Sequence, residues 1–266
     1  MIQREENGSQ EKEKTRREIV LDKDGNQLGE VVYDLGNGEI IEIQTRPYEN
    51  KSAEAEHYNE IVCATDDNGE ITPERLTRKE VREQGKRYLI VTSIILHDGE
   101  RAFFQHRSEQ KEIDPGGLSA SAHGVAKEIY QAGQRMQKTK DVVAINMALE
   151  INEELRHGAG AKQFCVKFWR GSKRELSEFA RKESIDDPDT IYLLPTVFLK
   201  SDGYPLGDKN NKRTRALFTG YIFSKKPPMV VFDCGESSKV ELLDSAEVIK
   251  DPKVIDDLKS IMINYY

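Results

Sequence analysis

One stretch of the sequence, residues 141–158, constrains the fold more than any other. It reads DVVAINMALEINEELRHG, and apolar residues recur in it at the three- and four-residue steps of one helix face. These apolar positions are Ala144, Ala148, Ile151 and Leu155. Glu150, Glu153 and Glu154 are neighbours on the same helix, so their like charges repel. The stretch therefore predicts a helix with one face turned to a core. Its carboxylates favour a hard divalent cation, because such cations prefer carboxylate oxygens.

The same residues resemble the second half of the Nudix box, Gx5Ex7REUxEExGU, in which U is aliphatic. Upstream, RYLIVTSIILHDGERAFFQHRSEQKEIDPGGLSASAHG is similar to the strand, hairpin strand and Gly-rich loop that precede the box. The similarity is greatest to the branch that includes isopentenyl diphosphate isomerase, where an arginine and a lysine follow the second strand. Arg107 and Lys111 stand at those places. The resemblance covers roughly residues 58–260 and implies a three-layer α/β/α sandwich with a mixed sheet.

The resemblance also implies roles for individual residues. In the family, the paired glutamates and the glutamate before them hold Mg²⁺ or Mn²⁺, and these roles fall on Glu150, Glu153 and Glu154 as catalytic metal ligands. The Gly-rich loop that shapes the approach to the helix corresponds to Gly116 and Gly117. An exposed acidic helix face, common in a chain that is 33% charged, is the alternative interpretation of the three glutamates.

Three other residues are candidate contacts of a diphosphate. Arg107 and Lys111 follow a predicted core strand close to the Gly-rich loop, where cations can grip phosphate oxygens, although solvated charges are the alternative. His123 is a candidate metal ligand, phosphate donor or proton shuttle, because histidine titrates near neutrality. A surface or hydrogen-bonding role in the loop is the alternative for His123.

The sequence departs from the Nudix box at several positions. Leu149 replaces the arginine that orients a catalytic glutamate, Asp141 replaces the first glutamate, and Arg156 stands where the box has glycine. Asp141 is interpreted as a helix cap or as an auxiliary metal ligand. Residues 118–140 separate Gly117 from Asp141 and form an insertion, in which residues 125–137 are predicted to form a short extra helix.

Composition limits the classes of partner. Lys and Arg number 40 against 47 Asp and Glu, and the net charge of −7 argues against broad binding to nucleic-acid backbones. Cys63, Cys165 and Cys234 are widely spaced and form no CxxC pair, which favours a reducing cytoplasm. No apolar run approaches the roughly 18 residues of a membrane span, and the first residues lack the apolar segment of a signal peptide. The predicted location is therefore the cytoplasm, with no membrane partner.

The order of predicted elements divides the chain into three parts. Residues 1–16 are predicted to be a flexible leader, 17–57 an N-terminal β-meander with hairpin turns at Asp24-Gly25 and Asn37-Gly38, and 58–266 a Nudix-like domain. In that domain, residues 72–85 and 175–184 are predicted to be helical, and Asp187-Pro188 to form a turn. A final helix is predicted to begin after Asp251. Strands and helices alternate in the mixed α/β class.

The favoured function is Mg²⁺- or Mn²⁺-dependent hydrolysis of a phosphoanhydride bond in a small diphosphate molecule, with a nucleoside diphosphate derivative as the first choice. A catalytically inactive Nudix-fold module that binds a nucleotide or a protein is the main alternative, motivated by Leu149 and the insertion. Isomerisation of an isoprenoid diphosphate ranks lower, because Ser119 and Ser121 stand where that chemistry needs a thiol. A homodimer, or a partner recruited by the meander, is left open.

Overall fold

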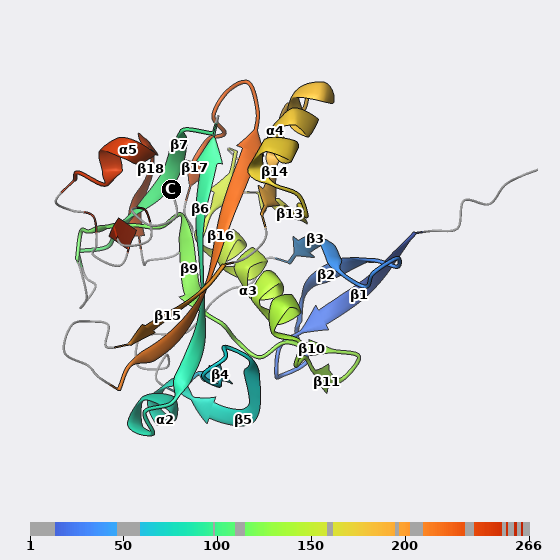
Figure 1. Ribbon diagram of the computed structural model, residues 1–266, viewed down its shortest axis with the longest axis vertical. Helices are drawn as coiled ribbons and strands as arrows, with labels where there is room; N and C mark the ends of the chain where they lie inside the picture. Colours follow the sequence, from blue (N-terminus) through green and yellow to red (C-terminus); the bar gives the residue numbers. More distant parts are fainter. Residues whose placement is uncertain are drawn as a thin grey trace, which may run out of the picture.

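The computed structural model describes residues 14–46, 59–97, 99–109, 115–158, 162–194, 197–202, 210–231, 237–251, 254, 258–259 and 262. The chain begins there with an antiparallel meander of β1 (Thr15–Leu21), β2 (Gln27–Asp34) and β3 (Ile40–Thr45). Gly25 and Gly38, with φ of 83° and 67°, lie in its two turns, as the Asp-Gly and Asn-Gly pairs predict. The predicted meander is confirmed (Figure 1). Residues 1–13 of the predicted leader and the linker at 47–58 lie outside the described residues.

A long parallel pair forms the centre of the sheet. β6 (Arg87–His97) is buried at every residue and pairs in parallel with β16 (Lys212–Phe223) over its whole length. Antiparallel neighbours make the sheet mixed, and β13 connects the meander to β14 and so to the centre. The neighbouring strands are β4 (Ile61–Thr65), β7 (Arg101–Arg107), β9 (Ala122–Val125), β13 (Cys165–Phe168), β14 (Asp187–Leu193) and β15 (Val197–Asp202). Shorter elements are β8 (Leu118–Ser119), β12 (Arg156–His157), β17 (Val230–Val231), β18 (Ser237–Asp244) and α5 (Ser245–Val248).

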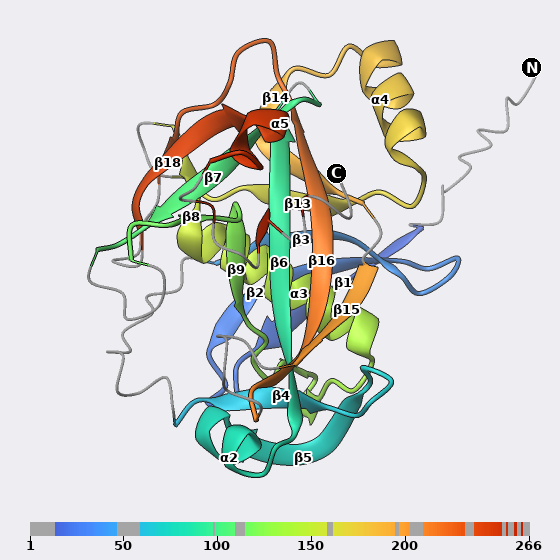
Figure 2. The same ribbon diagram turned by 60° about the vertical axis from the view of Figure 1, so that its left-hand side comes forward.

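Helices cover both faces of the central strands, because alternate strand residues point to opposite sides. On one side, Leu89 and Val91 of β6 pack in one cluster with α3 (Thr139–Glu154). On the other side, Ile94 of β6 packs with Leu176 of α4 (Lys173–Lys182) and with α5. The predicted α/β/α arrangement with a mixed sheet is confirmed (Figures 1 and 2).

Helix α3 is buried on more than one side. Its apolar face packs on the central strands as predicted, and Val31 and Ile43 of the meander belong to the same core cluster. Figure 1 shows α3 between the strands β6 and β9 and the meander. This enclosure places even the carboxylate side of the helix in a largely buried environment.

The expected helix at residues 72–85 is only partly correct. The structure has β5 (Ile71–Thr77), which pairs with β4, followed by the short helix α2 (Arg78–Glu83). Thr77 starts α2 through a reciprocal capping box with Glu80, and Gly85 follows its end with φ of 62°. The first half of the predicted helix is therefore a strand, because pairing with β4 outweighs its helical propensity.

The predicted helix at residues 125–137 is wrong. This segment contains a hairpin of β10 (Tyr130–Gln131) and β11 (Gln134–Arg135), and β10 pairs with β1. The two linking residues, Ala132 and Gly133, have positive φ of 48° and 76°. Two successive residues with positive φ form a tight hairpin turn and cannot continue a right-handed helix.

Asp141 does not cap α3. The helix begins at Thr139 after Lys138, and Asp141 lies in its first turn, where Oδ1 is 3.1 Å from Lys138 Nζ. Burial raises the pKa of its carboxyl group. The cap interpretation is therefore corrected to an ion pair within the first turn. α3 ends at Glu154, and Leu155 is already extended.

The remaining predicted elements belong to the C-terminal half of the chain. The predicted helix at 175–184 is confirmed as α4, whereas Asp187-Pro188 opens strand β14 and does not form a separate turn. Val254, Leu258 and Met262 are buried, but Pro252 and most of the predicted final helix lie outside the described residues. In the described part of the chain, no helix has the length and apolar character needed to cross a membrane.

Candidate functional site

The three glutamates lie in the last two turns of α3 and are less exposed than a solvated helix face. Glu150 and Glu154 are only 7% and 5% exposed, and the Glu153 side chain is 13% exposed. Their separations of three and four residues hold them near one another. The interpretation as a simple exposed acidic face is therefore wrong.

Glu150 lies against the backbone of β9. A Cβ atom built on Gly124 would overlap the carboxyl group of Glu150, so only a glycine at this position leaves room for that carboxyl group in its present rotamer. Gly124 was not singled out in the sequence, where it follows His123 without any turn signal. The Glu150 carboxyl group is thus fixed between α3 and the strand.

Replacing Gly124 with alanine is expected to disturb this contact. The added methyl must push Glu150 or β9 aside, and overpacking of this kind costs about 1–3 kcal/mol. Thermal unfolding of the variant would measure the loss. A matched Gly36→Ala variant is the control, because a Cβ there meets only the Asp34 side chain of an exposed turn. Equal stability of both variants would contradict the close approach.

Glu154 is oriented by two donors. Gln105 Nε2, on β7, donates to Glu154 Oε2 at 2.8 Å, and the backbone N–H of His123 donates to the same oxygen at 3.0 Å. Gln105 also donates to the carbonyl oxygen of Ser121 at 2.6 Å and accepts from the hydroxyl of Ser237. Hydrogen bonds at both ends of the amide fix its rotamer, and through it the carboxylate.

A lysine also lies among the carboxylates. Lys127 Nζ is 3.5 Å from Glu153 Oε2 and 3.7 Å from Oε1 of Glu60, a residue that precedes β4. Neither Lys127 nor Glu60 was identified from the sequence, where Lys127 falls in the segment predicted to be a helix. The repulsion among the glutamates did indicate a cation, and the structure supplies one from the chain itself.

The pKa of Glu150 reflects the charges that surround it. Burial raises its pKa well above the usual range, the nearby Glu153, Glu154 and Glu60 raise it further, and the Lys127 ammonium opposes them. Burial and carboxylate repulsion outweigh the lysine. The folded chain therefore favours the neutral form of the Glu150 carboxyl group, and a cation bound beside it would favour the ionised form.

The other predicted site residues that the structure describes are on β9, at the end of β7 and in the Gly-rich loop. The backbone N–H of His123 donates to Glu154, and its side chain belongs to the strand face opposite that of Gly124. Arg107 N donates to Gly117 O at 2.9 Å, which brings the Gly-rich loop to the end of β7. Gly116 has φ of 66°. Lys111 lies outside the described residues.

The three glutamates have the type of ligand atom that a hard divalent cation prefers, but their side chains are not positioned to bind one together. All three glutamates offer oxygen ligands in a negatively charged, partly dry environment. In the described ranges, however, no three His, Cys, Asp or Glu side chains stand close enough together to hold a metal ion as they are. Glu153 is engaged by Lys127 and Glu154 by Gln105, so binding requires these carboxylates to exchange partners.

Comparisons with known proteins give structural matches of low identity. No family model and no curated protein sequence matches the chain. Among solved structures, DR0079 from Deinococcus radiodurans matches with 12% identity and a TM-score of 0.43, covering 78% of this chain and 99% of its own. The MutT protein from Methanosarcina mazei Go1 matches with 13% identity and a TM-score of 0.37, covering 66% of this chain and 90% of its own.

A third match is to a bifunctional NMN adenylyltransferase/ADP-ribose pyrophosphatase from Francisella tularensis, in a complex with AMP and a manganese ion. Its identity is 10% and its TM-score 0.38, and the match covers 66% of this chain and 40% of that protein.

Proposed function

We propose that this chain is a Nudix-type hydrolase that cleaves a diphosphate linkage in a small molecule, with a nucleoside diphosphate derivative as the first choice. The observation that carries the proposal is the buried Glu150 carboxyl group, held against β9 at Gly124 and surrounded by Glu153, Glu154 and Glu60. Buried carboxylates with raised pKa values that lie beside one another are characteristic of functional sites, where a bound cation offsets their repulsion. The Gly-rich loop and the helix motif support the same assignment.

The proposed division of labour follows the positions of the side chains. Mg²⁺ or Mn²⁺ bound here would neutralise phosphate oxygens and help to activate water. Glu150, Glu153 and Glu154 would supply oxygen ligands, while Gln105 and the His123 N–H hold Glu154 in its orientation. Arg107, beside Gly117 and Gly116, is proposed to bind the diphosphate, together with Lys111.

A specific observation favours a second candidate, a binding module without catalysis. Leu149 is 4% exposed and belongs to the apolar core, so this helix position holds no cation that could orient a glutamate. Lys127 supplies some of the required positive charge without a metal. Isomerase chemistry gains less support, because Ser121 Oγ is used within the fold and donates to the carbonyl oxygen of Phe103.

The decisive experiment is product release from a panel of nucleoside diphosphate sugars, dinucleotides, nucleoside triphosphates and isoprenoid diphosphates, with Mg²⁺, Mn²⁺ or EDTA. We expect metal-dependent cleavage that falls by about 100-fold or more in the Glu153→Gln, Glu154→Gln double variant. Glu178→Gln, an exposed site on α4 paired with Arg174, is the charge-matched control and should retain activity. Tight binding of a panel member by folded protein with no turnover would favour the binding module.

Several broader assignments remain proposals. We infer a cytoplasmic location, supported by the free thiols of Cys63 and Cys165, and a small-molecule partner in preference to nucleic-acid backbones. The division into a leader at 1–16, a meander at 17–57 and a Nudix-like domain at 58–266 is a prediction, as is a homodimer. Measuring the molar mass of the full chain in solution by light scattering would test the last of these.

A further inference from the structure

Lys127 lies in the segment between β9 and β10, and its side chain is only 25% exposed. Its ammonium is placed between Glu153 of α3 and Glu60 before β4, within 4 Å of both carboxylates. It therefore links two parts of the chain that are far apart in sequence.

The backbone of Lys127 is clamped to the same helix that carries the glutamates. Asn146, which is 1% exposed, accepts from Lys127 N through Oδ1 at 2.8 Å and donates to Lys127 O through Nδ2 at 3.0 Å. Cys63 Sγ also donates to Lys127 O, at 3.3 Å. Asn146 lies one helical turn before Glu150, so α3 fixes both the carboxylates and the origin of the lysine side chain.

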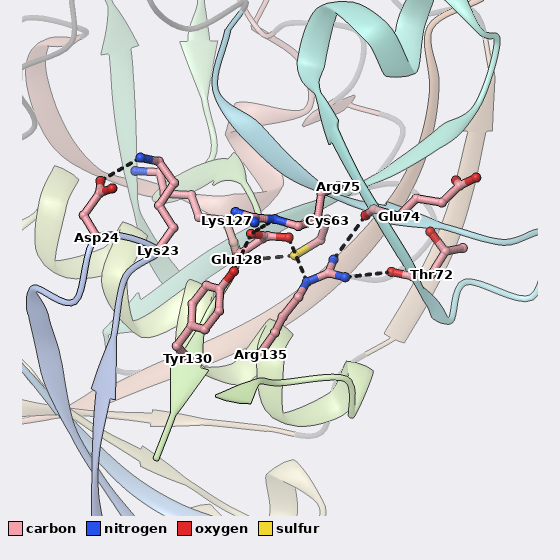
Figure 3. Close-up of polar contacts among 10 residues, drawn as sticks. All are labelled: Lys23, Asp24, Cys63, Thr72, Glu74, Arg75, Lys127, Glu128, Tyr130 and Arg135. Carbon is pink, nitrogen blue, oxygen red and sulfur yellow. Dashed lines mark hydrogen bonds and ion pairs between the residues drawn. The ribbon is translucent and has the colours of Figure 1, made fainter. Parts of the chain in front are cut away.

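The residue after Lys127, Glu128, is also held by side-chain contacts. Glu128 forms ion pairs with Arg135 Nε at 2.8 Å and Arg75 Nε at 3.2 Å, and it accepts from Tyr130 Oη at 3.0 Å. Figure 3 shows these partners around Glu128, with Lys127 and Cys63 beside it. An exposed lysine pair normally samples many rotamers and stabilises little. Here the anchored backbone restricts where the ammonium can go.

We propose that Lys127 is the resident counter-cation of this carboxylate site and sets its affinity for divalent cations, which must displace the ammonium from Glu153 in order to bind. The inference rests on the proposed metal-dependent function of the same glutamates. A cation that competes from within the chain weakens metal binding and offsets the repulsion among the carboxylates when no metal is bound.

The test is Mn²⁺ binding to the full chain, measured by electron paramagnetic resonance of free Mn²⁺ and by calorimetry. Lys127→Met removes the charge and keeps most of the side-chain volume, and it should bind Mn²⁺ about tenfold more tightly, or better, because one competing positive charge is gone. Lys127→Arg keeps the charge and should stay close to the wild-type affinity. Lys140→Met is the matched control, because Lys140 is an exposed lysine in the first turn of the same helix.

The outcomes separate this inference from the proposed function. Tighter binding by Lys127→Met, with unchanged binding by Lys140→Met, supports the inference. Equal or weaker binding by Lys127→Met, in protein whose wild type binds Mn²⁺, overturns the inference and leaves the proposed function standing. Binding by Lys127→Met alone supports the inference and removes metal dependence from the natural protein. Failure of both proteins to bind Mn²⁺ overturns both.

Discussion

Replacing Glu128 with alanine is expected to destabilise the protein by about 3–5 kcal/mol, the largest stability loss that we predict for a single side chain. Glu128 has a side chain that is 2% exposed and neutralises Arg135, whose side chain is 11% exposed. Removing the carboxylate leaves the Arg135 guanidinium desolvated without its main opposite charge. It also releases the anchor beside Lys127, so the segment between β9 and β10 loses its fixed position.

Urea unfolding followed by circular dichroism would measure this change. Glu178→Ala serves as the control, because its carboxylate is exposed and pairs across one turn of α4 with Arg174. The control should change stability by less than about 0.5 kcal/mol. If Glu128→Ala were no more destabilising than the control, the buried cluster would contribute little to the fold.

Replacing Glu150 with glutamine, unlike replacing Glu128 with alanine, is expected to stabilise the metal-free protein. We expect a gain of about 2 kcal/mol in the free energy of unfolding, or about 5 °C in Tm. Glutamine keeps the shape of the side chain and is neutral at every pH, so it avoids the free-energy cost of protonating or ionising a carboxyl group buried among Glu153, Glu154 and Glu60. The same change removes a proposed metal ligand. Mn²⁺ should therefore raise the Tm of the wild type and leave that of the variant unchanged.

The dependence on pH gives a second check of the Glu150 prediction. The folded-state pKa of Glu150 is raised above its unfolded value of about 4.3, so this group lowers stability progressively as the pH rises above about 4.3 and by its full amount above the folded-state pKa. The advantage of Glu150→Gln is then full at high pH, declines as the pH falls through the folded-state pKa, and vanishes below about pH 4. A difference in Tm that stayed constant from pH 8 to pH 4 would contradict a raised pKa.

Sequence periodicity predicted α3 well because the helix packs through a regular apolar stripe. Ala144, Ala148, Ile151 and Leu155 are all buried as the three- and four-residue steps require. The enclosure of the opposite side by the meander was not predictable in this way, since it depends on pairing between β3 and β13. Long-range pairing of this kind leaves little local signal in the sequence.

In the candidate site, too, some residues could be predicted from local spacing and others could not. Glu150, Glu153 and Glu154 were identified from their spacing, whereas Gln105, Gly124 and Lys127 enter only through contacts between distant elements. The segment that carries Lys127 has a helix-like composition, and its true conformation is decided by the turn at Ala132 and Gly133 and by pairing with β1. In this segment, pairing with a distant strand outweighs the local helical propensity.

The pairing of β3 with β13 has a consequence for synthesis. Ile43 faces Val166, so the meander leaves the ribosome roughly 120 residues before its partner strand does, a wait of on the order of ten seconds at usual elongation rates. Until then the outer edge of β3 can pair with any other exposed strand, including that of another nascent chain. We therefore expect β3 to be one of the strand edges at which the growing chain can misassemble when elongation is slowed.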